Sequence, residues 1–259
     1  MTEAEIGKIK AVVPERLESP KFWVEHIPFA FYLLTKLKPS VIVELGVHSG
    51  NSFFAFCQAV KENSLSTKCY GIDTWLGDKH SGHYYADVYE SVVKHQQENY
   101  PHSGILIKKT FNEALNNFKD GSIDLLHIDG LHTYEGVRDD FQNWLPKLST
   151  KGVVLFHDTQ IKMKDFGVWK FWSEVSKKYP SFEFDHGCGL GVLVIGKDVL
   201  PEIQSFINEV NRSENYQLFF KNEGRRIYEL YKKERIKSGM KSIFLIHRII
   251  AKRFKRTSA

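Results

Sequence analysis

The sequence is short of cysteine and has no long apolar run. Its three cysteines, Cys57, Cys69 and Cys188, lie far apart and form no CxxC pair. This spacing argues against a disulfide scaffold or a zinc site and favours a reducing compartment. The N-terminal residues contain no apolar leader, and no stretch approaches the roughly 20 apolar residues that a bilayer-spanning helix needs. We therefore expect a cytoplasmic protein.

Charge is unevenly distributed along the chain. From Lys221 to the C-terminus there are 13 Lys and Arg against 3 Asp and Glu, whereas the preceding 220 residues have 23 against 28. The net charge of +5 therefore comes from the C-terminal part, and the remainder is mildly acidic. Because 42% of the residues are apolar, we expect a sizeable core and not a disordered chain.

Short apolar runs alternate with helical patterns, which predicts an α/β fold with a doubly wound, mostly parallel sheet. The clearest helical pattern covers 134–148, where Pro146 predicts a bend near the end. Only three residues separate the last two runs, which is too short for a crossover and predicts an antiparallel hairpin at the sheet edge. The predicted strands are 41–46, 69–73, 105–109, 123–129, 152–158, 182–186 and 190–196.

The loop after the first predicted strand, in VELGVHSGNS (43–52), carries two glycines. Gly46 allows a sharp turn after the strand, and Gly50 allows the backbone to approach a ligand where a helix begins. Glu44, within the buried strand, is costly without a partner or a task. Asp73 ends the second strand, where an acid can accept both hydroxyls of a ribose. The loop is therefore either a nucleotide-binding loop or a tight turn.

These motifs resemble the E-x-G-x-x-x-G loop and the second-strand acid of class I S-adenosylmethionine-dependent methyltransferases. Three further segments are similar to the macrocin O-methyltransferase-like group of bacterial sugar O-methyltransferases: GIDTW (71–75), IDLLHIDGLHTYEGVRDDFQNWLPKLSTKGVVLFHDT (123–159) and DFGVW (165–169). The resemblance covers residues 20–197. It implies a Rossmann-like sheet of seven strands in the order 3-2-1-4-5-7-6, with the last strand antiparallel.

The resemblance also implies a division of the chain and a cofactor site. Residues 1–40 form an N-terminal helical segment, 41–200 the methyltransferase domain and 201–259 a basic helical extension. The cofactor is S-adenosylmethionine, and each part of it has its own contacts in the family. On this chain the methionine part lies against Glu44, Gly46 and Gly50, the ribose on Asp73, the adenine near Thr110 and Phe111, and Asp129 also contacts the cofactor.

Acidic and imidazole side chains follow the fourth and fifth predicted strands. Asp129 ends the fourth strand, and His157 and Asp158 end the fifth. Neighbouring strands lie about 4.8 Å apart, and ligands bind beyond the carboxyl ends of such strands. Two carboxylates and an imidazole there predict a divalent-cation site, and oxygen ligands favour Mg²⁺ or Mn²⁺ over zinc.

His132, three residues after Asp129, is the predicted general base. Methyl transfer to a hydroxyl requires loss of the hydroxyl proton, and a histidine with a pKa of about 6.5 can accept it. The resemblance supports this role, because related antibiotic-sugar methyltransferases use the residue at this D-G-x-H position as base. Asp158 would assist His132, with or without a cation. The alternatives are a solvated turn residue for His132 and a packed strand end for His157.

Three other polar residues near this motif are expected to have structural roles. Strand alternation points His127 away from Ile128, and within an apolar run it is interpreted as a core histidine with its hydrogen bonds satisfied. Asp139 and Asp140 fall on the polar side of the helix that follows, and we expect both to be solvated.

The stretch WLGDKHSGHYYADVY (75–89) is polar and aromatic, and it is predicted either to fold over the acceptor as a lid or to be an ordinary surface loop. His80, His83 and Tyr84 are its candidate substrate-binding residues. The segment HIPFAF (26–31) either closes the cofactor site or packs in the core.

The C-terminal segment KSIFLIHRIIAKRFKR (241–256) has the pattern of a basic amphipathic helix. Such a helix predicts contact with an anionic membrane surface, which would be the inner face of the membrane. The alternative is packing on a partner subunit, and a homo-oligomer is therefore possible. Nucleic acid is not an expected partner, because the N/D-P-P-Y signature of base-modifying methyltransferases is absent.

The sequence thus predicts a metal-assisted O-methyltransferase. The expected acceptor is a sugar hydroxyl of a bacterial glycan or glycoside, which can be lipid-linked. Two alternatives remain on the same fold: a hydroxylase-like enzyme, which the middle motif also resembles, and a non-catalytic binding module whose working part is the tail.

Overall fold

The computed structural model describes residues 1–80, 82–83, 86–199 and 201–256, with side chains described as far as Ser238. A seven-stranded sheet of order β5-β2-β1-β6-β7-β9-β8 forms the centre. Counted along the chain, these seven strands have the predicted order 3-2-1-4-5-7-6. The pairs β7–β9 and β9–β8 are antiparallel and the other neighbours are parallel, so the predicted fold class is confirmed. The strands are β1 (Val41–Leu45), β2 (Lys68–Asp73), β5 (Gly104–Lys108), β6 (Ile123–Ile128), β7 (Leu148–His157), β8 (Ser181–Phe184) and β9 (Leu190–Val194).

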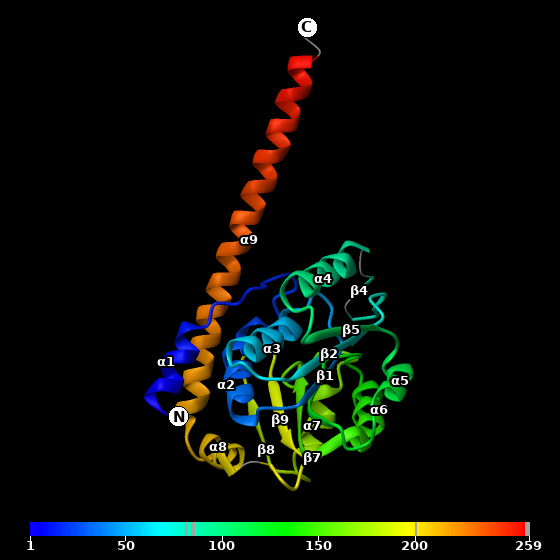
Figure 1. The fold of residues 1–259 in the computed structure, drawn as a ribbon, viewed down its shortest axis with the longest axis vertical. Coiled ribbons are helices and arrows are strands. Elements are labelled where there is room, and N and C mark those ends of the chain that lie inside the picture. The colour runs from blue at the N-terminus through cyan, green and yellow to red at the C-terminus, as the bar shows by residue number, and fades with distance from the viewer. Residues whose placement is uncertain (81, 84–85, 200, 257–259) are drawn as a thin grey trace.

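Helices cover both faces of this sheet (Figure 1). Alternate residues of each central strand face opposite layers: in β7, Leu155 joins one apolar cluster and Phe156 the other. One face packs against α5 (Phe111–Ala114), α6 (Tyr134–Trp144) and α7 (Val168–Val175). The other packs against α1 (Glu3–Ala11), α2 (Ile27–Leu37), α3 (Asn51–Glu62), α4 (Ala86–Asn99), α8 (Pro201–Arg212) and α9 (Glu214–Arg256).

A local sequence signal, Pro146, explains where helix α6 ends. The helix α6 stops at Trp144, and Pro146 lies in the 3-10 turn η3 (Leu145–Lys147) that follows, so the predicted bend is confirmed. The described residues of the stretch 75–89 include regular structure. It contains a small antiparallel hairpin, β3 (Gly77–Asp78) with β4 (Gly82–His83), and the start of α4.

The segment 26–31 packs in the core, which was one of its two expected roles. Phe29 lies against Phe184, with ring centroids 4.8 Å apart, and is also in contact with Phe220 of α9. The residues just before this segment line a cavity instead. Ser19, Pro20, Phe22 and Trp23 lie around it together with Gly46, which follows β1.

The long helix α9 is attached to the body through its first half. Arg226 donates to the backbone oxygens of Val12 and Ile9 at 3.0 and 3.3 Å, and Arg235 lies 2.9 Å from the Glu18 carboxylate. Beyond this the helix runs away from the body (Figure 1). The faces predicted for 241–256 concern side chains outside the described residues, so the tail contact stays a prediction. Among the described residues, no helix combines the length and apolar character needed to span a bilayer.

The loops after β1 and β6 cross at very close range. Gly46 has φ +94°, and a Cβ on it would lie 2.1 Å from the Asp129 carbonyl oxygen. The Asp129 N–H donates to the Leu45 carbonyl at 2.9 Å, which fixes the same contact from the other side. Glycine is therefore required at position 46 for conformational and steric reasons together.

We expect Gly46→Ala to lower the free energy of unfolding by about 2 kcal/mol or more. The left-handed backbone costs about 1 kcal/mol for a residue with a Cβ, and the methyl group would meet a backbone oxygen that cannot rotate away. Urea unfolding followed by circular dichroism measures the change. Gly7→Ala in α1 is the control, because a Cβ there meets nothing within 4 Å, and alanine favours a helix. Equal midpoints for the two variants would contradict the close approach.

Candidate active site

The loop after β1 is held by the carboxylate of Asp73 at the end of β2. Asp73 Oδ2 accepts hydrogen bonds from the backbone N–H groups of Val47 and His48 at 3.0 and 2.9 Å, and Oδ1 accepts from Trp75 N–H at 2.7 Å. Burial raises the pKa of Asp73 above its ordinary value even though these three donors act in the opposite direction. The loop needs this support, because His48 (φ 49°) and Gly50 (φ 86°) both adopt left-handed backbone conformations.

Glu44 lies beneath the loop and takes part in a buried chain of hydrogen bonds. Ser52 Oγ donates to Glu44 Oε1, His127 Nδ1 lies 3.2 Å from the same oxygen, and Trp23 Nε1 donates to His127 Nε2 at 3.1 Å. Since His127 Nε2 is an acceptor here, Nδ1 carries the proton and donates to Glu44. Glu44 is fully buried, and burial raises its pKa. Glu44 lines neither of the two cavities described below, and its predicted cofactor contact stays a prediction. His127 is the satisfied core histidine that was predicted.

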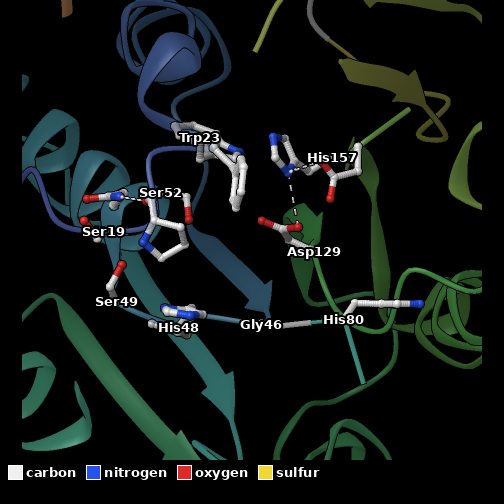
Figure 2. A pocket seen from close by; sticks show the side chains of 14 residues that line it. Ser19, Trp23, Gly46, His48, Ser49, Ser52, His80, Asp129 and His157 are labelled. Carbon is white, nitrogen blue, oxygen red and sulfur yellow. Dashed lines mark hydrogen bonds and ion pairs between the residues drawn. The ribbon is translucent and has the colours of Figure 1, made fainter. Parts of the chain in front are cut away.

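Two cavities open at the carboxyl ends of the strands and share Gly46 and Asp129. The first, of about 450 Å³, lies between the N-terminal segment, the start of α3 and the end of β7. Figure 2 shows His48 and Ser49 on one side of it and Asp129 and His157 on the other. The second, of about 390 Å³, lies between the ends of β2 and β5 and the start of the β6–α6 loop. The two cavities adjoin at these shared residues, and we refer to them together as the trough; their volumes suit a small organic ligand.

A cluster of two carboxylates and two imidazoles lies beside the first cavity. His132 Nε2 is 2.9 Å from Asp158 Oδ2 and 3.5 Å from Asp129 Oδ1. His157 Nδ1 is 3.2 Å from Asp129 Oδ1 and 3.4 Å from Asp158 Oδ1. The backbone of Asp158 has φ +61°, a strained conformation that turns its carboxylate back toward the cluster. The fold therefore brings together all four residues predicted at these strand ends.

The predicted metal ligands and the group of donor atoms in the structure differ at one residue, His157. Its Nε2 lies 3.1 Å from the Gly187 carbonyl oxygen, so this nitrogen must carry a proton, and its Nδ1 faces two carboxylates. Both nitrogens of His157 are therefore engaged in this structure. The atoms that gather within 4.8 Å of one another instead belong to Asp129, His132 and Asp158, a donor set of oxygens and one nitrogen that fits Mg²⁺ or Mn²⁺.

The protonation of the cluster follows from its geometry. Burial alone would lower the pKa of both histidines, but the carboxylates outweigh it and raise the pKa of His157 to about 9 and that of His132 to about 10. Burial likewise opposes ionisation of Asp129, yet the charge of His157 and the hydrogen bonds from both imidazoles hold its pKa well below the ordinary value. Near neutral pH, in the absence of a cation, the site therefore holds ionised Asp129 between two imidazolium groups.

The remaining predicted residues are placed at different distances from the trough. Phe111 and Thr110 line the second cavity, and His80 lines the first, with its ring 5.5 Å from that of His132. His83 is exposed in β4 and lines neither cavity. Tyr84 lies outside the described residues.

Two residues that line the trough were missed or misassigned from the sequence. Trp23 lines the first cavity, and the only sequence signal for it was the aromatic cluster KFW. Asp140 was expected to be solvated, but it lines the second cavity and is half-buried. The helical spacing contained this information, because Asp140 is three residues after Val137 and four before Trp144, on the buried face of α6. Asp139 is exposed, as expected.

Comparisons with known proteins agree with this geometry. Residues 43–159 match a family model described as a methyltransferase domain. The protein y4gI of Sinorhizobium fredii (strain NBRC 101917 / NGR234), described as uncharacterized, is 46% identical over 186 residues, which are 72% of this chain and 20% of y4gI. The chain therefore spans about a fifth of the length of that relative.

Solved methyltransferase structures share the fold. The SAH-bound methyltransferase PaMTH1 of Podospora anserina has a TM-score of 0.51 at 13% identity, covering 75% of this chain and 88% of that one. A methyltransferase from Geobacter sulfurreducens has a TM-score of 0.50 at 14% identity, covering 75% and 90%. At such identities the likeness extends to the fold alone.

The stability of the protein should depend on pH through the two raised histidines. Because the folded-state pKa values of His157 and His132 lie above the ordinary 6.5, their contribution to stability is complete below about pH 6.5 and is lost as the pH rises through about 9 and about 10. We expect the free energy of unfolding, measured with urea in EDTA, to fall by about 1 kcal/mol or more between pH 7 and pH 10. A double variant, His132→Gln with His157→Gln, should lose less over this range, and an equal loss would contradict the assignment.

Proposed function

Because residues 43–159 match a methyltransferase-domain model and lie on the class I methyltransferase fold, we propose that the protein transfers a methyl group from S-adenosylmethionine to a sugar hydroxyl. One observation carries the proposal: two cavities adjoin at Gly46 and Asp129, and the first is also lined by Asp158, which groups with Asp129 and His132. A cofactor lying along the trough would present its reacting group to that cluster. When bound, the cofactor supplies an electrophilic methyl group on a sulfonium.

The residues of the first cavity suit the binding and orientation of both reactants. The N-terminal turn of α3, with Ser49 and Asn51, provides backbone N–H groups for the carboxylate of the methionine part. Trp23 and Phe22 offer aromatic surface, and Ser19 a hydroxyl, on the side where an acceptor would lie. Sugars combine apolar ring faces with hydroxyl rims, which this mixture fits. Methyl transfer then requires the acceptor oxygen about 3–3.5 Å from the methyl carbon.

His132 is the residue we assign to accept the hydroxyl proton. Without a cation, a pKa of about 10 keeps His132 protonated near neutral pH. A divalent cation held by Asp129 and Asp158, beside His132, would neutralise the carboxylates that raise this pKa and would acidify a nearby hydroxyl. His132 would then be neutral and able to accept the hydroxyl proton. Asp129 holds the cluster in place in either arrangement through His157.

The chemistry of the cluster also separates this proposal from its rival. A hydroxylase of the non-haem iron class uses two histidines and one carboxylate on one face of the metal. The trio brought together within the described residues has one histidine and two carboxylates. This donor set favours a redox-inert cation and therefore group transfer.

The proposal is tested by turnover with S-adenosylmethionine and a panel of methyl hexosides, with catechol as a phenolic control and release of S-adenosylhomocysteine as the readout. We expect turnover on at least one hexoside and a loss of about 100-fold or more in kcat for His132→Gln, with little change in binding of S-adenosylhomocysteine. Asp139→Asn is the matched control, because Asp139 is exposed and pairs only with Arg138 within the described chain. Turnover confined to catechol would contradict the sugar acceptor.

Metal dependence is tested separately by titration calorimetry with Mn²⁺. Wild-type protein should bind one Mn²⁺, and Asp158→Asn should weaken that binding at least tenfold, because it removes one of two anionic ligands. His157→Gln should weaken it much less, since His157 is outside the group of three residues whose donor atoms lie within 4.8 Å of one another. Full activity in chelator, with metal content shown to be negligible, would contradict a cation in the reaction.

A further inference from the structure

The second cavity contains a carboxylate with no bonded partner. Asp140, from the buried face of α6, lines this cavity and is half-buried. Within the described part of the chain it makes no hydrogen bond and no ion pair. Burial and the neighbouring charge of Asp139 raise its pKa to about 7. A half-buried carboxylate without a donor is costly, so its placement calls for a ligand that can donate a hydrogen bond.

The other polar residues of this cavity are already engaged. Thr110 caps α5 and exchanges hydrogen bonds with Glu113. Asn112 accepts from Asn143 at 3.2 Å, and Asp73 accepts three backbone N–H groups. Asp140 also stands apart from the trio that can hold a cation. Among these residues it is therefore the one whose full hydrogen-bonding capacity is available to a ligand.

The walls around Asp140 fit a flat aromatic ring. Phe111 and Leu131 line the cavity with apolar surface, and Gly130 lies between them without a side chain. A Cβ on Gly130 would lie 2.4 Å from the Phe111 ring and 3.2 Å from Asp140 Oδ2. The absent side chain thus keeps both the apolar wall and the carboxylate open to the same ligand. Asp73, where a ribose is expected, lines the other end of this cavity.

We propose that Asp140 is the residue that selects adenine, accepting a hydrogen bond from its 6-amino group while the ring lies between Phe111 and Leu131. The inference rests on the proposed use of S-adenosylmethionine and adds the residue that reads its base. The 6-amino group is the only strong donor on the edge of adenine, and a carboxylate is a strong acceptor without a donor of its own when ionised.

The test is a double cycle with calorimetric binding as the readout, so it does not depend on turnover. The two ligands are S-adenosylhomocysteine and its 6-deamino analogue, in which hydrogen replaces the amino group, and the two proteins are wild type and Asp140→Ala. We expect wild type to bind the amino ligand about tenfold more tightly, which corresponds to about 1.4 kcal/mol. Asp140→Ala should lose this preference to within twofold. Asp139→Ala, one residue away and exposed, should retain it.

A second variant separates recognition from a structural role. Asp140→Asn keeps the size of the side chain, and its amide can turn to donate to a 6-oxo group. It should therefore bind S-inosylhomocysteine at least as well as wild type does, while weakening S-adenosylhomocysteine binding. The assignment would be overturned if wild type bound S-adenosylhomocysteine and its 6-deamino analogue equally. It would also be overturned if Asp140→Ala kept the tenfold preference. A wild type that binds neither ligand would instead overturn the proposed function.

Discussion

The contact between Gly46 and the carbonyl of Asp129 is the constraint on which the rest of the site depends. It brings the loop after β1 to within van der Waals range of the loop after β6, with no room for a side chain between them. The backbone of Gly46 thereby becomes the floor of both cavities, and the carboxylate of Asp129 stands at their junction. A shift of either loop would therefore change how the second cavity lies relative to the cluster of Asp129, His132 and Asp158.

The charged cluster divides into a fixed part and an exchangeable part. His157 is bonded at both nitrogens, and its anchor, the Gly187 carbonyl at 3.1 Å, also accepts from His26 at 3.0 Å. The hairpin between β8 and β9 therefore locks His157, which in turn locks Asp129. His132 is held by carboxylates on one nitrogen only, and its Nδ1 has no hydrogen-bond partner in the described structure. Positive charge on His157 can thus be structural while that on His132 can be replaced by a cation.

The sheet and the chemistry at its strand ends could be predicted from sequence, because apolar runs, Gly46 and the acids at strand ends are local signals. The role of His157 could not be predicted, because it depends on the Gly187 carbonyl, which lies 30 residues later in the chain and is brought close by a hairpin. The sequence showed that a buried Glu44 needs a partner or a task, but it could not name His127, because that partner is supplied by a different strand. Asp140 was within reach of prediction, because its spacing from Val137 places it on the buried face, and only its polarity suggested solvent.

The two cavities of the trough are built partly by different elements of the chain. A shared fold therefore does not show which acceptor binds. The second cavity is lined by residues at strand ends, by Gly77 and Asp78 of β3 and by Asp140 on a helix packed against the sheet. The first cavity also has strand-end residues in its lining, but Ser19, Pro20, Phe22 and Trp23, which precede the sheet, and His80 add to it. The ring of Phe166 stacks on His132 at 5.0 Å and lies 4.6 Å from His80, so the wall over His132 also comes from outside the sheet. If the acceptor binds in the first cavity, as we propose, its specificity can therefore change through these segments without altering the strands of the sheet.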